Sequence, residues 1–109
     1  MRHAAGIAAL ALAALACAQP AAAGDAAQGK EKAAKCKTCH GIDGIAKIPI
    51  APHLAGESQI YLETQLKAFR SGKRVHEMMS VIAKDLTDED ISDVAAWYAS
   101  IRITAEMPQ

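Results

Sequence analysis

Cys36, Cys39 and His40 belong to the segment CKTCH, in which two thiols lie three residues apart and an imidazole follows directly. Thiols and imidazoles bind metal ions, and paired thiols also form redox-active disulfides or bonds to a prosthetic group. Three kinds of chemistry are therefore open to this segment: a metal site, a redox disulfide and the attachment of a haem. The choice among them decides the function of the chain.

The surrounding sequence disfavours the first two. A thioredoxin-like redox pair needs a βαβ setting, and nothing in the sequence alternates like a strand. A structural zinc site needs four protein ligands, and CKTCH supplies three at most. His53 or His76 could be a fourth ligand, but neither belongs to a second paired motif. C-x-x-C-H is the attachment signature for c-type haem, so we expect two thioethers to one haem, with zinc and disulfide as alternatives.

Helices must position this segment. Asp25–Gln28 is a plausible capping box, and the Ala- and Lys-rich sequence after it predicts a helix to about Cys36. The glycines and prolines of residues 41–57 predict a loop.

Further helices are expected after the loop. Ser58 can cap a second helix that ends at Gly72, residues 80–84 favour a short helix, and Thr87 begins a last one. The last helix carries an apolar stripe of Ile91, Val94, Ala95, Tyr98 and Ile101. The predicted fold class is all-α, with three to five helices.

The N-terminal sequence predicts export. Residues 1–23 combine a short basic start with an uncharged apolar run and small residues for cleavage at Ala23. We therefore predict a signal peptide over residues 1–23 and one domain over residues 24–109, with no membrane-spanning segment in the mature chain. A lipoprotein signal ending at Cys17 is a weaker alternative.

The composition argues against nucleic-acid binding and indicates that a bound group fills part of the core. Removal of Arg2 leaves 11 basic residues against 12 acidic ones, which gives no electrostatic footprint for nucleic acid. Aromatic residues are few, so a chain of this size needs something more to fill its core, such as a prosthetic group.

The basic and acidic residues are segregated along the sequence. Lysines 30, 32, 35, 37 and 47 lie near CKTCH in the sequence, and acidic residues cluster at 85–93.

From about residue 25 to 101 the chain resembles a class I c-type cytochrome of the short bacterial single-haem kind, and one half of the bacterial two-haem cytochromes. The resemblance rests on short motifs in a fixed order: Gly29, CKTCHG at 36–41, Pro52 with Leu54, Tyr61-Leu62, Gln65-Leu66, FRSGKR at 69–74, Met79-Ser80 and LTDEDISDVAAWYAS at 86–100.

The resemblance implies roles for single residues. His40 would be the proximal ligand of the iron, and the Pro52 carbonyl would bind its other ring nitrogen. Leu54 would press on the haem face. Gly29 would allow the first and last helices to cross closely, with Trp97 or Tyr98 packed over it.

The sixth ligand is expected to be Met79. A haem iron with one open coordination position favours a soft axial donor. The family places its methionine just before a short helix and a helix start that corresponds to Thr87. Met78 is the main competitor, and Met107, His53 and His76 are weaker candidates. The segment His76-Glu77-Met78 departs from the family, which often has Asn or Pro ahead of the ligand.

The implied function is electron transport. A haem with both axial positions filled exposes no site for substrate, and no other group of residues suggests catalysis, so we expect a periplasmic electron carrier rather than an enzyme. It would be a monomer that docks transiently with a redox donor and a redox acceptor. The alternatives are a haem-bearing subunit of a secreted dehydrogenase or oxidase complex, and a ligand-binding sensor if Met79 leaves the iron free.

Overall fold

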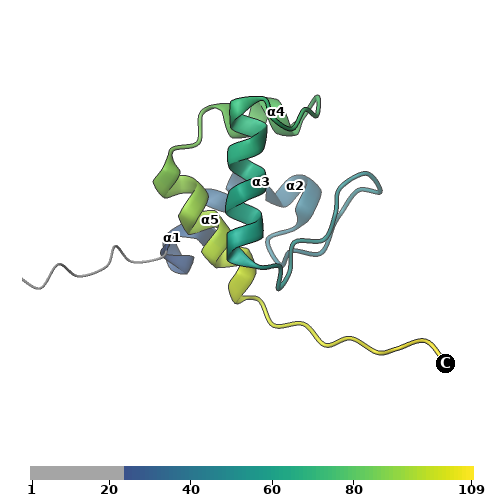
Figure 1. Cartoon of the computed structure of the whole chain (residues 1–109). Helices are drawn as coiled ribbons and strands as arrows, with labels where there is room; N and C mark the ends of the chain where they lie inside the picture. The colour runs from purple at the N-terminus through teal and green to yellow at the C-terminus, as the bar shows by residue number, and fades with distance from the viewer. Residues whose placement is uncertain (1–23) are drawn as a thin grey trace, which may run out of the picture.

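The computed structural model describes residues 24–109, and the predicted signal peptide of residues 1–23 lies outside the described residues. The described part confirms the all-α prediction, because it contains helices and no strand (Figure 1). None of these helices has the length and apolar character that crossing a membrane requires. Their order along the chain is α1 (Ala26–Lys32), η1 (Ala33–Lys35), α2 (Lys37–His40), α3 (Gln59–Ser71), α4 (Met79–Lys84) and α5 (Asp88–Ser100).

The first helix is shorter than predicted. Asp25 caps α1 as expected, with its Oδ1 accepting from the N–H groups of Ala27 and Gln28. The helix ends at Lys32, and the tighter turn η1 then separates it from α2. A single helix to Cys36 was therefore a wrong prediction. The interruption leaves α1 packed on α5 and gives CKTCH its own short helix.

The loop and α3 follow the prediction. Residues 41–57 contain no helix in the structure. Ser58 caps α3, with its hydroxyl oxygen accepting from the N–H of Tyr61 at 3.1 Å. Gly72 ends the helix at φ +82°, a left-handed conformation that glycine adopts without strain.

The last two helices also form where expected. The short helix α4 begins at Met79, one residue before the predicted start. Thr87 and Asp90 make a full capping box at the start of α5, each side chain accepting from the backbone N–H of the other at 3.0 Å. The acidic side chains in this first turn also complement the positive end of the helix dipole.

The crossing of α1 and α5 depends on Gly29. An added Cβ at Gly29 would lie 1.8 Å from the carbonyl oxygen of Asp93 and 3.0 Å from the Cβ of Trp97. This confirms the predicted close crossing, with Trp97 rather than Tyr98 over the glycine. The backbone N–H of Asp25 also contributes to the crossing, because it donates to Asp93 Oδ1 at 2.8 Å. The predicted capping box had assigned this N–H to the side chain of Gln28.

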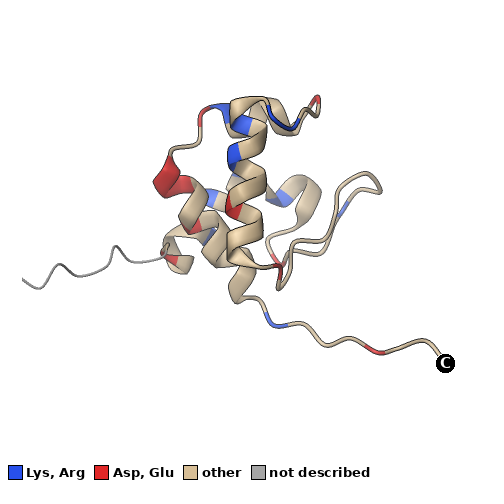
Figure 2. Ribbon diagram, in the orientation of Figure 1, with Lys and Arg blue, Asp and Glu red and all other residues tan. Residues whose placement is uncertain are grey.

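Lys32 joins the same crossing. Its Nζ donates to Asp93 Oδ2 at 2.7 Å and lies 3.1 Å from Asp90 Oδ1. Asp93 is buried, and the hydrogen bond from Lys32 is the first cause of its lowered pKa. The lysines near CKTCH in the sequence therefore do not form one basic ring. Figure 2 shows acidic residues grouped at the start of α5. Lys32 pairs with this acidic start, and Lys47 pairs with Asp43.

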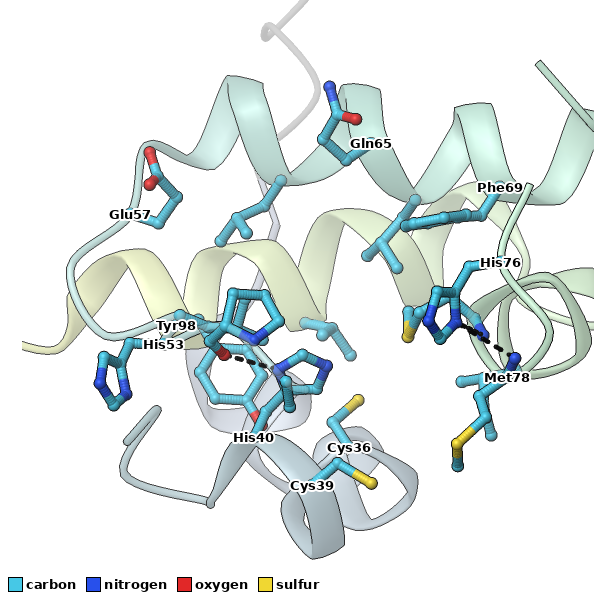
Figure 3. A pocket seen from close by; sticks show the side chains of 18 of the residues that line it. Cys36, Cys39, His40, His53, Glu57, Gln65, Phe69, His76, Met78 and Tyr98 are labelled. Carbon is cyan, nitrogen blue, oxygen red and sulfur yellow. Dashed lines mark hydrogen bonds between the residues drawn. The ribbon is translucent and has the colours of Figure 1, made fainter. Parts of the chain in front are cut away.

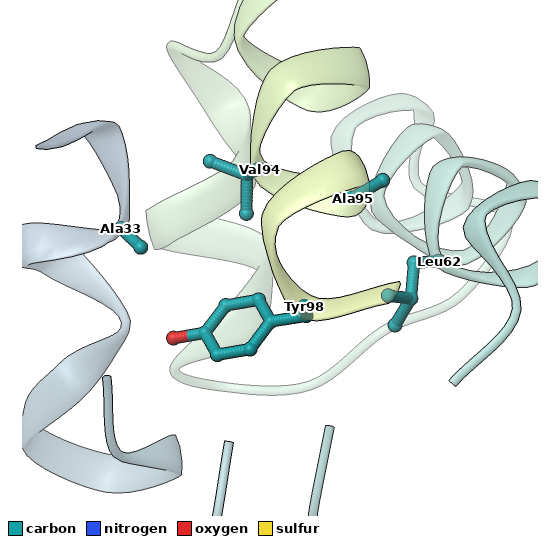
Figure 4. Close-up of a cluster of buried hydrophobic side chains, with 5 residues drawn as sticks. All are labelled: Ala33, Leu62, Val94, Ala95 and Tyr98. Atoms are coloured by element: carbon teal, nitrogen blue, oxygen red, sulfur yellow. The ribbon is translucent and has the colours of Figure 1, made fainter. Parts of the chain in front are cut away.

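The core is small. Its central cluster consists of Ala33, Leu62, Val94, Ala95 and Tyr98, which come from η1, α3 and α5 (Figure 4). Two of the five are alanines, so helix backbones approach closely here but bury little side-chain volume. Most of the larger apolar side chains face a cavity instead, as described below.

Replacement of Gly29 by alanine tests the crossing. Alanine favours a helix by about 1 kcal/mol over glycine, but the new Cβ would overlap the Asp93 carbonyl. We expect Gly29→Ala to lower the free energy of unfolding by about 1–3 kcal/mol, as for other overpacked sites. Gln28→Ala, at the exposed neighbouring position, should change it by less than about 0.5 kcal/mol. Urea unfolding measures both, and a stabilised Gly29→Ala protein would contradict the close crossing.

The Asp93 carboxylate should make stability depend on pH. Because its pKa is lower in the folded chain than in the unfolded one, it stabilises the fold above about pH 4, and this contribution is lost as the pH falls through the folded pKa. We expect Asp93→Asn to be less stable than wild type at pH 7, and the difference to shrink below about pH 4. Urea unfolding at both pH values measures this. Glu89→Gln is the control, because Glu89 is 82% exposed and lies 3.8 Å from the same lysine. A difference that stays constant with pH would exclude the proposed role of Asp93.

Candidate functional site

A cavity of about 490 Å³ lies between the CKTCH segment, the loop 41–57, α3, α4 and α5. Figure 3 shows Cys36, Cys39 and His40 on one side of it and Phe69, from α3, on the other. This volume falls in the usual range for a bound organic group, about 300–1,000 Å³. Apolar side chains form most of the wall, among them Leu62, Leu66, Phe69, Ile82 and Val94.

His40 is buried and its ring orientation is fixed. Its Nδ1 donates to the carbonyl oxygen of Pro52 at 2.8 Å, as the resemblance implied. A neutral imidazole carries one proton, so this bond leaves Nε2 as the unprotonated nitrogen. His40 also lines the cavity. The ring can therefore offer one nitrogen lone pair to a metal in the cavity while the other nitrogen is held by the loop.

The two thiols also line the cavity. Cys36 and Cys39 are both half-buried and lie on the same side of the cavity as His40 (Figure 3). Burial raises the pKa of the Cys36 thiol to about 11, and the charge of Lys35 acts in the opposite direction. A redox-active pair needs a thiol with a lowered pKa, because the thiolate is the nucleophile. Cys36 has the opposite property, which disfavours the disulfide alternative.

The aromatic residues of α5 hold the chain just after His40. Tyr98 Oη donates to the carbonyl oxygen of Gly41 at 2.9 Å, and Trp97 Nε1 donates to that of Ile42 at 2.9 Å. The sequence predicted packing roles for both residues and missed these bonds. The available signal was their polar atoms, since a buried tyrosine or tryptophan usually finds a partner for its O–H or N–H. Burial also raises the pKa of Tyr98, so its hydroxyl stays a donor.

Both candidate methionines line the cavity wall that α4 forms. Met79 is half-buried, whereas Met78 is 45% exposed. Leu54 is half-buried and also lines the cavity, and Pro52 is exposed at its edge. The structure thus brings together the six residues assigned from the sequence: Cys36, Cys39, His40, Pro52, Leu54 and Met79. Met107, in the C-terminal tail, does not line the cavity.

The two other histidines within residues 24–109, His53 and His76, each use a ring nitrogen within the protein. His53 Nδ1 accepts from the N–H of Ala46 at 2.8 Å, and His76 Nδ1 accepts from the N–H of Met78 at 3.2 Å. Both side chains are exposed, as expected, although both also reach the cavity. Within residues 24–109 no three histidine, cysteine or acidic side chains converge as ligands of one metal ion.

A haem fits these residues. It needs an apolar cleft, two thiols at one edge and an axial donor, and the cavity provides an apolar wall, Cys36 with Cys39, and the free nitrogen of His40. Sequence reasoning had not placed Phe69 and Arg74 at this site. The Arg74 guanidinium lies 4.6 Å from the centre of the Phe69 ring and donates to Gln65 Oε1 at 2.7 Å. Arg74 itself lines the cavity, and its contacts with Phe69 and Gln65 support this wall.

Sequence comparison identifies relatives of this chain. A model of the cytochrome c family matches residues 26–102. Cytochrome c-554(548) of Halomonas halodenitrificans is 48% identical over 74 residues, covering 65% of this chain and 89% of the relative. Cytochrome c4 of Pseudomonas aeruginosa is 43% identical over 76 residues, covering 70% of this chain but 38% of the relative.

Comparison with solved structures also finds cytochromes c. Reduced recombinant cytochrome c4 from Pseudomonas stutzeri superposes with a TM-score of 0.69 at 36% identity, covering 73% of this chain and 47% of that one. The chain thus spans nearly all of the single-domain relative and less than half of the cytochromes c4. The matched residues contain the whole cavity and the CKTCH segment. The chain therefore belongs to the cytochrome c family of electron carriers with covalently attached haem c.

Proposed function

We propose that this protein is a periplasmic electron carrier, which takes one electron from a redox protein and passes it to another. The functional domain would be residues 24–109, exported by a signal peptide over residues 1–23. The observation that carries the proposal is the bond between His40 Nδ1 and the Pro52 carbonyl, which leaves Nε2 available at an apolar cavity that both thiols share.

The residues have distinct roles in this proposal. When bound, haem c supplies an iron that alternates between its ferrous and ferric states. Cys36 and Cys39 would hold the group by two thioethers, and His40 would give its Nε2 lone pair to the iron. Met79 would give its thioether sulfur from the α4 side, and Leu54 would press on the group. Because His40 and Met79 would both bind the iron, substrate would not reach it, so we infer a carrier rather than an enzyme.

A second candidate function is that of an electron-accepting subunit of a dehydrogenase complex. A Stutzerimonas stutzeri relative named thiosulfate dehydrogenase electron acceptor is 40% identical over 70 residues. This match covers 32% of the length of that relative. A solved thiosulfate dehydrogenase (TsdBA) from Marichromatium purpuratum matches with a TM-score of 0.65 at 35% identity, over 18% of that chain. Purification from the native host distinguishes the two. A stable complex with a dehydrogenase supports the subunit, and a separate small protein supports the carrier.

Substitution of each methionine tests the proposed sixth ligand. We expect Met79→Ala to lose the methionine-to-iron absorption band of the oxidised protein completely, because Met79 is the less exposed of the two and begins α4. Met78→Ala is the matched control and should keep the band. Carbon monoxide binding to the reduced wild-type protein would instead support the sensor alternative, because it requires an open position on the iron.

Charge at the cavity should affect docking. Lys35 is exposed and lines the cavity, so its charge can attract an acidic redox partner. We expect Lys35→Glu to slow electron transfer to an acidic partner by about tenfold or less at low salt, and the difference to shrink as salt rises. Lys67→Glu is the control, since Lys67 is exposed on α3 and does not line this cavity. Stopped-flow rates that are insensitive to ionic strength would exclude electrostatic steering.

A further inference from the structure

His76 closes the turn that leads into α4. Its ring Nδ1 accepts from the backbone N–H of Met78 at 3.2 Å and, more weakly, from that of Met79 at 3.4 Å. Figure 3 shows the first of these bonds beside the cavity. In the other direction, the N–H of His76 donates to Ser80 Oγ at 3.0 Å, and the N–H of Ser80 donates to the His76 carbonyl at 2.9 Å.

These bonds resemble those of a helix N-cap, but they close the turn that precedes α4, whose own flanking residue is Met78. An N-cap residue accepts the first helical hydrogen bond with its carbonyl, and its side chain accepts from the N–H groups two and three residues later. His76 does both, with Ser80 as the donor of the first bond and Met78 and Met79 as the donors to its side chain. The imidazole Nδ1 thus does what the Oδ1 of an asparagine does in an ordinary cap.

Little else holds this turn. Residues 71–78 are all exposed, and Met79 is the first partly buried residue after them. A methionine thioether is a soft, neutral donor on a flexible side chain, so the backbone that carries it contributes to keeping it in place. The hydrogen bonds of the His76 turn therefore contribute to restraining the backbone of Met79, and an ordinary helix cap changes an equilibrium constant by about fivefold.

We propose that His76 is a positioning residue for the sixth ligand, and that its imidazole holds the backbone of Met79 so that the thioether stays in the cavity. This rests on the proposed function, in which Met79 binds the iron. Displacement of Met79 by an added ligand requires the turn to open, and opening breaks the bonds to Nδ1. Removal of the cap should therefore make displacement easier.

The test is a cyanide titration of the oxidised, haem-loaded protein, followed by loss of the methionine-to-iron band. We expect His76→Ala to bind cyanide about fivefold more tightly than wild type. Asn can place an oxygen where Nδ1 lies, so His76→Asn should stay within about twofold of wild type. Gln places its polar atoms near the position of Nε2 instead, so His76→Gln should resemble His76→Ala.

Ser58→Ala is the matched control for stability. It removes an N-cap of the same kind from α3, so it should lower the urea midpoint without changing the cyanide affinity. Equal affinity in His76→Ala and wild type would overturn the proposal, as would an Asn variant that behaves like Gln. If Met79→Ala kept the methionine-to-iron band, the proposed ligand itself would fall, and the role of His76 with it.

Discussion

The hydrogen bond from His40 to the Pro52 carbonyl is the interaction on which the site depends. It joins two segments that the sequence separates by twelve positions, and it fixes both the tautomer and the orientation of the ring. The loop is folded to make this bond possible, since Leu54 and Ala55 both donate to the Gly44 carbonyl at its base. A loop without helix or strand therefore has a defined role, because it presents one carbonyl oxygen to one ring nitrogen.

The small core is a second feature that is linked to the cavity. Helix backbones approach closely at alanines and at Gly29, and several larger apolar side chains of α3, α4 and α5 line the cavity, among them Leu66, Phe69 and Ile82. A haem bound in this cavity would fill the centre of the hydrophobic core, and folding and cofactor binding would then be coupled. A group that binds the folded chain and not the unfolded one adds its binding free energy to stability. The scarcity of aromatic residues in the sequence has this physical meaning.

Local signals predicted much of this fold from the sequence. Caps such as Ser58 and Thr87 act within one turn of helix, so the starts of α3 and α5 could be placed from neighbouring residues. The attachment motif predicted the cofactor for the same reason. The end of α1 and the pairing of Lys32 could not be predicted, because both depend on contacts with α5, some sixty positions away. The bonds from Tyr98 and Trp97 to the residues after His40 were missed on the same ground.

The two sides of the cavity are held very differently. On the His40 side, the ring is buried and bound to the loop, and the buried hydroxyl of Tyr98 holds the next residue, Gly41. On the Met79 side, the chain arrives through an exposed turn that is closed by hydrogen bonds. Rapid electron exchange requires little change in coordination, and fluctuation should concentrate where the backbone is least packed. Under the proposed function, in which Met79 binds the iron, the exposed turn is therefore the part of the domain whose local hydrogen bonds matter most for keeping this ligand in place.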